Sequence, residues 1–470
     1  MNDSAQTDPA SLRADLGWVV AAKAAIGVTV LLGGFVAVSD DDFSRIVLAQ
    51  RWAIEPKLDP TGTSWLPFPF WLNGGVMWLL GRSLAVAQSS AFVLGLMAAM
   101  VLYASARNLT NRRAAVVGAI LASSFPWSAR LGVAAVPELL TAALCVFALS
   151  TLAKPSARLR LWGAAAMLAA CLSRYEPWLP ALVFAAYTLR DARDKRHHWL
   201  PLAVALFGPL AWLGHNALAH GHPLHFLARV SAYQRAVAGK ASLMVSLTGY
   251  PLSLLREEPE LCFVAALLFV TQWRRGKAAI KHTAGAPLAI ALGLMLLALS
   301  AARLPGGAPT HHAGRALLAI WLALAIYVAH VADQLLAEAP RRFFVMAAAL
   351  VATLLVGGLV LRPWYARLDA FSARGEELAI GAAVRRHASA GQRVLIQVDD
   401  FAFFAVQAAS GRPEAFVRDR DIDPRKRPQA SSFGSIEALQ GRAQAGRVRW
   451  VVAKATAVTY RLGPPVAIAG

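Results

Sequence analysis

The residues best suited to chemistry form the run Ser39-Asp40-Asp41-Asp42-Phe43, which follows a long apolar segment. Three adjacent carboxylates repel one another, so we expect a raised pKa in at least one, which suits a general base or a cation site. The same residues also suit a helix start, where Ser39 caps the backbone and the acids favour the helix dipole. The sequence leaves both interpretations open.

Further polar side chains lie at the predicted ends of other apolar segments. Arginine, lysine and histidine can hold an anionic phosphate, whereas carboxylates and tyrosines can orient a substrate or move a proton. The candidates are Glu138, Arg174, Tyr175, Glu176, Tyr233, Arg235, Lys240, Arg303, His311, His312 and Arg315. Structural explanations compete with these roles. Glu138 can cap a helix, Arg174 can pair with Glu176, and Arg315 can extend to the lipid headgroups.

Four histidines lie close together in the sequence, at His215, His220, His222 and His225. Their ligand type permits zinc. No cysteine and no carboxylate close in sequence joins them, so we expect no metal at this cluster. For the protein as a whole we expect no certain cofactor, with a divalent cation possible at the acidic triplet.

The elements that position these residues are long apolar segments. Of the 470 residues, 57% are apolar and 16% are charged, and the mean hydropathy is +0.48. This composition excludes a single soluble domain, a disordered chain and a disulfide scaffold, and it indicates a polytopic membrane protein. Eleven candidate spans lie near 18–38, 84–106, 114–127, 138–153, 161–173, 177–189, 199–214, 260–273, 284–302, 316–332 and 343–361.

The positive charge is explained by membrane topology. The net charge is +20, and compact basic loops near 107–113, 154–160, 190–196, 274–281 and 341–342 alternate with loops that carry fewer cations. By the positive-inside rule, the basic loops and the N-terminus are cytoplasmic, and everything after residue 362 is extracytoplasmic. We find no basic stripe interleaved with aromatics, so we expect no nucleic-acid partner.

The pattern predicts two regions. Residues 1–362 form a helix bundle of about eleven spans, with large outer loops at 39–83 and 215–259 that contain amphipathic helices. Residues 363–470 form a small outer α/β domain, because soluble helical and strand patterns alternate there. We expect helices at 376–387, 401–409 and 435–445, strands at 393–398 and 448–453, and a loop at 411–433.

Several short motifs occur in an order that resembles the GT-C superfamily of polyprenyl-phosphate-sugar glycosyltransferases, nearest the protein mannosyltransferase and aminoarabinose transferase branch. The acidic run at 40–42 resembles the acidic pair after the first span of that family. Pro137-Glu138 and Ser173-Arg174-Tyr175-Glu176 are similar to its charged outer turns, and 221–227 resembles its Gly-x-Pro-Leu-x-Phe segment. Leu66-Pro67-Phe68-Pro69 stands where many members have His-Pro-Pro, so the histidine of the family is absent.

The resemblance implies transfer of mannose or another hexose from a polyprenyl phosphate to a hydroxyl of a protein, lipid or glycan, with inversion. Asp40, Asp41 or Asp42 would be the general base, and Arg174 and Arg315 would stabilise the leaving phosphate. The main alternative is a transporter or lipid flippase. Transporters commonly contain internal repeats and broken mid-membrane helices. We find no convincing repeat, and the charged candidates lie at predicted outer helix ends.

Overall fold

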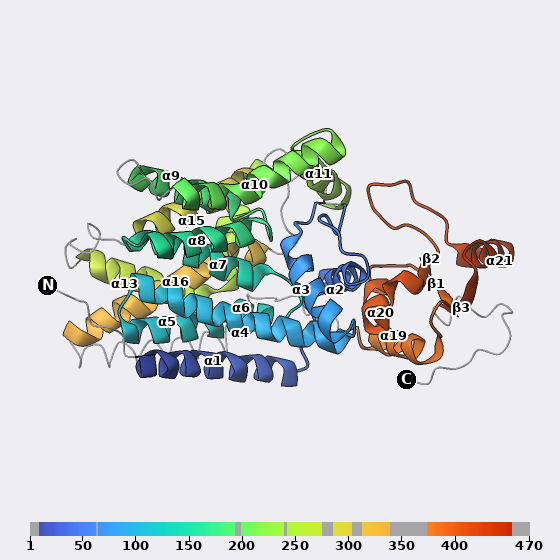
Figure 1. Cartoon of the computed structure of the whole chain (residues 1–470), viewed down its shortest axis with the longest axis horizontal. Coiled ribbons are helices and arrows are strands. Elements are labelled where there is room, and N and C mark those ends of the chain that lie inside the picture. The colour runs from blue at the N-terminus through green and yellow to red at the C-terminus, as the bar shows by residue number, and fades with distance from the viewer. Residues whose placement is uncertain are drawn as a thin grey trace.

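The computed structural model describes residues 9–62, 64–192, 199–238, 242–274, 285–302, 313–338 and 374–453. Helices dominate from residue 9 to residue 338 (Figure 1). They are α1 (Pro9–Leu32), α2 (Asp40–Trp52), α3 (Phe68–Leu80), α4 (Leu84–Leu109), α5 (Arg112–Ser124), α6 (Pro126–Leu131), α7 (Glu138–Ser150), α8 (Ala157–Cys171), α9 (Trp178–Ala192), α10 (Trp199–His220), α11 (His225–Ala238), α12 (Leu243–Glu257), α13 (Pro259–Arg274), α15 (Ala286–Ala302) and α16 (Ala313–Glu338).

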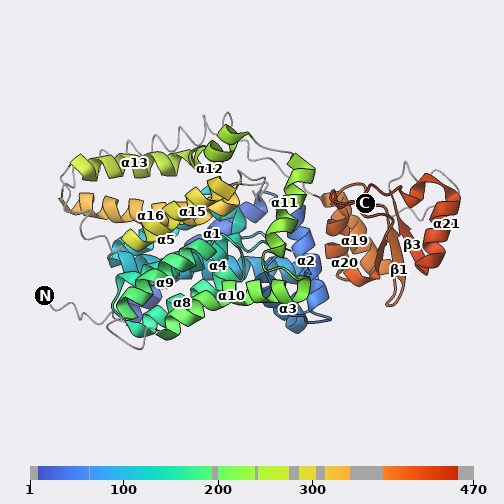
Figure 2. The same cartoon turned by 90° about the horizontal axis from the view of Figure 1, so that it is seen from above.

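The molecule has three parts along its longest axis (Figure 1). A bundle that includes α1, α4, α5, α7, α8 and α16 occupies one end. Helices α2, α3 and α11 lie across the ends of the bundle helices, and a C-terminal domain lies beyond them (Figures 1 and 2). The crosswise helices therefore separate the bundle from the C-terminal domain.

The predicted apolar segments match helices of the bundle. Ten of the eleven coincide with described helices, and the eleventh, 343–361, lies outside the described residues. Helices α1, α4, α10 and α16 are long and apolar enough to cross a membrane. The segment expected at 114–127 is divided, because α5 ends before Pro126, which opens α6. Proline is favoured at the first helical position, because the N–H that it lacks would have no partner within the helix.

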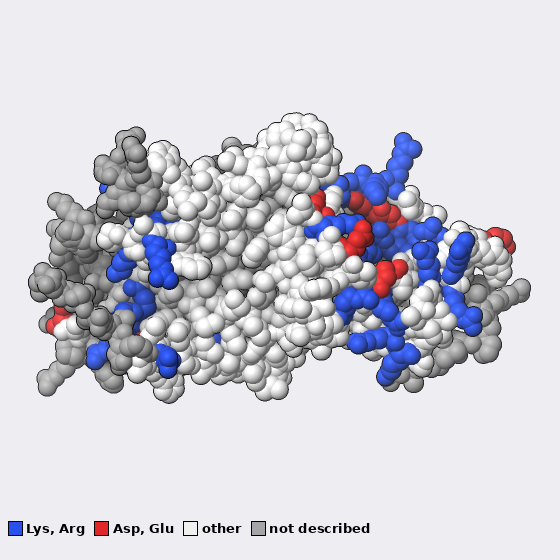
Figure 3. All heavy atoms as spheres, viewed as in Figure 1, with Lys and Arg blue, Asp and Glu red and all other residues white. Residues whose placement is uncertain are grey.

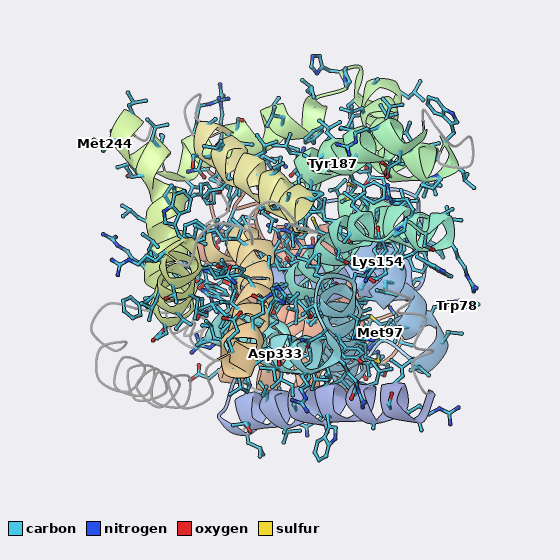
Figure 4. The ribbon with its side chains drawn as sticks, turned by 90° about the vertical axis from the view of Figure 1, so that its left-hand side faces the viewer. Trp78, Met97, Lys154, Tyr187, Met244 and Asp333 are labelled. Carbon is cyan, nitrogen blue, oxygen red and sulfur yellow. The ribbon has the colours of Figure 1, made fainter. Side chains whose placement is uncertain are left out.

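The outside of the bundle fits a lipid environment. Figure 3 shows a face that is nearly free of charged side chains along the bundle, with Lys and Arg at its far end and on the C-terminal domain. Large apolar side chains such as Trp78 and Met244 are about 70% exposed and lie at the rim of the bundle (Figure 4). An uncharged band of this kind is suited to hydrocarbon rather than water. The chain is an integral membrane protein.

The C-terminal domain contains a three-stranded parallel sheet in the order β2-β1-β3. The strands are β1 (Arg393–Ile396), β2 (Phe416–Arg418) and β3 (Val448–Val452), flanked by helices α19 (Gly375–His387), α20 (Phe403–Ser410) and α21 (Ile436–Ala445). The three expected helices and two expected strands are present. The expectation of an uninterrupted loop at 411–433 was wrong, because Phe416 pairs with Val394 and starts β2. Three residues are too few for alternation to be recognised.

The two large outer loops contain helices, as expected. The first, 39–83, forms α2 and α3, and the second forms α11 and α12. The first residues of the predicted second loop, 215–220, are helical, because α10 continues to His220. The last turns of α10 therefore carry two of the clustered histidines on a rigid helix.

The C-terminal domain packs directly on α2. The Gln50 side chain donates one hydrogen bond to the Ala408 carbonyl (2.8 Å) and another to the Arg82 carbonyl (3.0 Å). Arg82 also forms a two-bond ion pair with Glu414, at 3.0 Å for each bond. Gln50 is fully buried, so its amide supplies a donor to two carbonyls that water cannot reach from that side, and it links α2 to both segments. The position of α2 thus depends on the C-terminal domain.

Close packing inside the bundle can be tested at Gly95 in α4. A Cβ there would meet the backbone of Gly132, whereas a Cβ at Gly293 in α15 would meet open space. We expect Gly95→Ala to lower the free energy of unfolding by about 1–3 kcal/mol, as overpacked interiors do. Gly293→Ala should be neutral or slightly stabilising because alanine favours helix.

The measurement is thermal unfolding in detergent followed with a thiol-reactive dye, since Cys145, Cys171 and Cys262 are all buried free thiols. Equal melting midpoints for Gly95→Ala and Gly293→Ala would contradict the close approach of α4 to Gly132.

Candidate functional site

The acidic triplet occupies the first turn of α2, which lies between the bundle and the C-terminal domain (Figure 1). Ser39 has the extended backbone of an N-cap, and Ser39 and Asp42 form a capping box. This motif satisfies backbone donors that the first helical turn leaves unpaired. The helix-start interpretation is therefore correct, and it fixes a different direction for each of the three carboxylates.

Asp42 points into the protein. Its Oδ2 accepts hydrogen bonds from the backbone amides of Val38 (3.2 Å) and Ser39 (3.1 Å), and the residue is 2% exposed. Burial raises the pKa of Asp42 to about 6, although the charge of Arg315 opposes this shift. Asp42 thus has a structural role as the cap of α2.

Asp40 points toward the C-terminal domain. Its two carboxylate oxygens accept hydrogen bonds from Arg374 Nε (3.1 Å) and Nη2 (2.9 Å). Burial raises the pKa of Asp40, and the bonds from Arg374 partly offset that rise. Arg374 also lies 3.4 Å from Asp400, whose other oxygen accepts from the backbone amide of Ala402. Both oxygens of Asp40 are thus already engaged.

Asp41 is the most accessible of the three carboxylates. Its side chain is 51% exposed, and its Oδ2 lies 3.4 Å from Nη1 of Arg315. Arg315 lies in the first turn of α16 and also donates to Ser39 Oγ at 2.6 Å. Arg315 places a positive charge close to the N-terminal end of α16, which is rich in backbone donors. This position therefore favours an anion in addition to Asp41.

A chain of buried charges continues from Arg315. Its Nη1 lies 3.8 Å from Glu138 Oε1, which accepts a hydrogen bond from Arg174 Nη1 at 2.5 Å. Arg174 also forms an ion pair with Glu176. The predicted residues Glu138, Arg174, Glu176 and Arg315 therefore form one connected set of charges that reaches Asp41. The proposed ion pair between Arg174 and Glu176 is present, and it does not exclude a role in substrate binding.

Arg45 belongs to the same cluster and was missed by the sequence analysis. Its guanidinium carbon lies 4.4 Å from the centre of the Trp65 ring and 5.8 Å from that of Phe70. Burial lowers the pKa of the Arg45 guanidinium, and the nearby negative charges of Glu138 and Asp41 oppose that shift. The sequence could have indicated this position. Arg45 follows Asp41 by four residues on a predicted helix, and residues four apart share a helix face.

Two buried donors in this cluster lack an acceptor. Among the residues that the structure describes, no hydrogen bond is made by Nε of Arg45 or Nε of Arg315. Buried donors are almost always paired in native proteins, and the loss is larger for charged groups. These two arginine donors, which have no acceptor among the described residues, lie beside an accessible carboxylate and are available to a further hydrogen-bond acceptor.

Tyr175 makes contacts that connect several segments near the cluster. Its hydroxyl donates to the Ser64 carbonyl (2.7 Å) and accepts from Trp212 Nε1 (3.1 Å). Its ring stacks on Phe226 with the centroids 4.5 Å apart. Tyr175 therefore holds the loop after α2 against α10 and α11, which makes it a positioning residue.

The remaining candidates are only partly described. Tyr233 of α11 has its ring centre 5.7 Å from the Arg425 guanidinium carbon, and burial and the charge of Asp41 both raise its pKa. Arg235 lies two residues further along α11, and within the described part of the chain no interaction joins it to the cluster. Lys240, Arg303, His311 and His312 lie outside the described residues.

Comparisons with known proteins bear on this geometry. Residues 61–214 match the family model of dolichyl-phosphate-mannose-protein mannosyltransferases. ArnT from Cupriavidus metallidurans, solved bound to undecaprenyl phosphate, aligns with a TM-score of 0.59 and 15% identity over 93% of this chain and 90% of its own. The archaeal oligosaccharyltransferase AglB from Archaeoglobus fulgidus, solved with an inhibitory peptide and a dolichol-phosphate, aligns with a TM-score of 0.53 and 15% identity. That alignment covers 92% of this chain and 68% of AglB. No curated protein matches.

The chain has the GT-C glycosyltransferase fold. The family match covers a third of the sequence, and the structural likeness extends over nearly all of it. Both comparisons point to the same fold. The superfamily resemblance inferred from short motifs is confirmed, and the expected helical membrane architecture with a small α/β domain is confirmed with it.

The role of Asp42 as a buried cap predicts a pH-dependent stability. The pKa of its carboxyl is about 6 in the folded protein, against an ordinary value of 3.8. The folded state therefore binds the proton more tightly, so stability falls as the pH rises from about 4 through 6. Two pKa units correspond to about 3 kcal/mol.

We expect Asp42→Asn, which keeps the acceptor oxygen, to be more stable than the wild type by up to about 3 kcal/mol at pH 8. That difference should shrink by about half at pH 5. The measurement is the denaturation midpoint of both proteins at the two pH values. A difference that is equal at both pH values would show that Asp42 is not buried as a carboxylate.

Proposed function

We propose that the protein transfers a sugar, such as mannose or another hexose, from a polyprenyl phosphate to a hydroxyl acceptor on the extracytoplasmic side. The main support for this proposal comes from two arginine donors, Arg45 Nε and Arg315 Nε. Neither has an acceptor among the described residues, and both belong to the cluster around the exposed carboxylate of Asp41. A transferase of this type needs cations for the phosphate and a base for the hydroxyl at one place.

Asp41 is the proposed general base. Asp40 is occupied by Arg374, and Asp42 caps α2 from a buried position, so both are poorly placed to meet an acceptor. Asp41 would accept the hydroxyl proton while the acceptor oxygen bonds to the anomeric carbon. The bond from that carbon to the phosphate oxygen breaks, and its electron pair leaves with the lipid phosphate. A single displacement of this kind inverts the anomeric carbon.

Arg315 and Arg45 are the proposed phosphate contacts. Arg315 faces Asp41, and it lies in the first turn of α16, where anions are favoured. Arg45 is held by the Trp65 ring with one donor free. Arg174 is engaged by Glu138 and Glu176 and would act mainly by holding Glu138 in place. Charge stabilisation of the leaving group is usually the largest contribution of such a site.

The lipid chain of the donor has a suitable neighbour. A cavity between α3, α4 and α7 is lined mainly by apolar side chains, including Leu72, Leu94 and Leu140. It reaches Pro137 and Ser173, which directly precede Glu138 and Arg174 in the sequence. An apolar cavity beside a charged cluster suits the part of a lipid tail that lies nearest to its phosphate. ArnT and AglB were solved with lipid phosphates of this class.

The assignment of the base is tested by Asp41→Asn. We expect this variant to lose transfer from radiolabelled undecaprenyl-phosphate mannose by about 10²–10⁴-fold, the usual contribution of a general base. Purified protein would be assayed with a panel of lipid, peptide and glycan acceptors. Asp42→Asn serves as the matched control and should retain most activity. Full activity of Asp41→Asn in an assay where the wild type is active would remove Asp41 from the mechanism.

The phosphate contacts are tested by binding of undecaprenyl phosphate, which requires neither the sugar nor the acceptor. Arg315→Gln and Arg45→Gln should each weaken binding about tenfold or more, because a charged hydrogen bond contributes about 1.5–3 kcal/mol. Arg51→Gln, in the last turn of the same helix as Arg45, is the control and should bind normally. Unchanged binding in both site variants would contradict the proposed phosphate position.

The proposed side of the membrane can be tested by labelling. The three native thiols are buried, so cysteines introduced at Leu58 and Arg113 report on opposite ends of the bundle. We expect a membrane-impermeant maleimide to label Leu58→Cys on intact cells and Arg113→Cys only after permeabilisation. The reverse pattern would place Asp41 in the cytoplasm and contradict an extracytoplasmic reaction.

A further inference from the structure

The loop after α2 meets the end of α10 at a group of three potential metal ligands, Asp59, His215 and His220. One ligand atom from each lies within 4.8 Å of the other two. Asp59 Oδ2 and His215 Nε2 are 3.2 Å apart. The sequence predicts no metal here, because no carboxylate lies near these histidines in the chain. The fold supplies one from 156 residues upstream of His215.

The Asp59 carboxylate has a fixed orientation. Its Oδ1 accepts hydrogen bonds from the Thr61 backbone amide (3.1 Å), the Thr61 hydroxyl (3.2 Å) and the Gly62 amide (3.0 Å). These bonds leave Oδ2 directed at His215. Hydrogen bonds to the far oxygen of a carboxylate are the usual means by which a metal ligand is oriented. The side chain is 12% exposed, so this orientation is largely shielded from solvent.

The two histidine rings are also restrained. His215 stacks on Trp212 with the centroids 5.1 Å apart, and His220 stacks on His225 at 4.3 Å. Trp212 is itself fixed by its hydrogen bond to Tyr175. His222, in contrast, uses its Nδ1 to accept from the Leu224 amide, so it is engaged in the local turn. The fold thus separates two candidate ligands from a neighbour of identical chemistry.

We propose that Asp59, His215 and His220 bind a divalent transition metal, with Zn²⁺ the ion that the ligand set fits best. Two imidazoles and one carboxylate are a common zinc ligand set, and a water would complete a tetrahedron. With metal–ligand bonds of about 2.0–2.2 Å, ligand atoms lie about 3.3–3.5 Å apart. Asp59 and His215 already have nearly this spacing, and a ligand nitrogen of His220 lies within 4.8 Å of both.

The site would act as a clamp on the loop between α2 and α3. That loop also carries Trp65, whose ring packs on Arg45 of the acidic cluster. A metal at Asp59 would join the loop to the rigid end of α10 and thereby restrict Trp65 and Arg45. This inference stands apart from the proposed transfer reaction, because it concerns ligand geometry and is tested by metal binding.

The experiment is titration of the full-length protein in detergent with Zn²⁺ alone, after removal of metal by a chelator and dialysis, followed by isothermal titration calorimetry. We expect one Zn²⁺ per chain. Asp59→Asn, His215→Ala and His220→Ala should each weaken binding at least tenfold. His222→Ala is the matched control and should bind as the wild type does.

Folding of each variant is checked independently by gel filtration and thermal unfolding without metal. Zn²⁺ should also raise the melting midpoint of the wild type and of His222→Ala but not of His215→Ala, because a ligand stabilises the state that binds it. No stoichiometric binding by the folded wild type would overturn the proposal and leave Asp59 and His215 as an ordinary ion pair. Equal loss in His222→Ala would overturn the ligand assignment. Neither result depends on whether the protein transfers sugar.

Discussion

The arrangement of the helix ends that lie nearest the C-terminal domain depends on a continuous set of charges, most of which are buried. Asp41, Arg315, Glu138 and Arg174 come from three helices and one turn, and Glu138 has no exposed surface. Removing one partner of a buried ion pair costs about 3–5 kcal/mol, because the other charge is left without compensation. The ends of α2, α7 and α16 are therefore held in one arrangement, which leaves Asp41 accessible beside two arginine donors.

The C-terminal domain contributes to the same arrangement. Arg374 occupies Asp40, and Ala408 receives a hydrogen bond from the buried amide of Gln50, so both ends of α2 contact that domain. Because α2 lies across the bundle, one of its faces points away from the bundle helices. The domain covers that face, and it distinguishes Asp40 from Asp41 by giving a cationic partner only to the first.

Much of the fold could be predicted from the sequence because local pattern determines it. Ten apolar segments are helices, and the helix start at Ser39 follows from a capping residue followed by acids. The three-residue strand β2 could not be predicted, since its pairing with β1 provides the stability that its own sequence lacks. The gathering of Glu138, Arg174 and Arg315 was predicted from their shared position at outer helix ends, and the distances support that prediction.

The sequence by itself determined a helical membrane protein with an acidic triplet at a helix start, because hydropathy, charge placement and capping are local properties. Only the tertiary structure decided which aspartate is accessible, that Arg45 belongs to the cluster, and that Asp59 reaches His215 across 156 residues. These outcomes depend on which direction each side chain takes once helices pack. Direction is set by contacts between segments that are remote in the chain, and no local pattern encodes it.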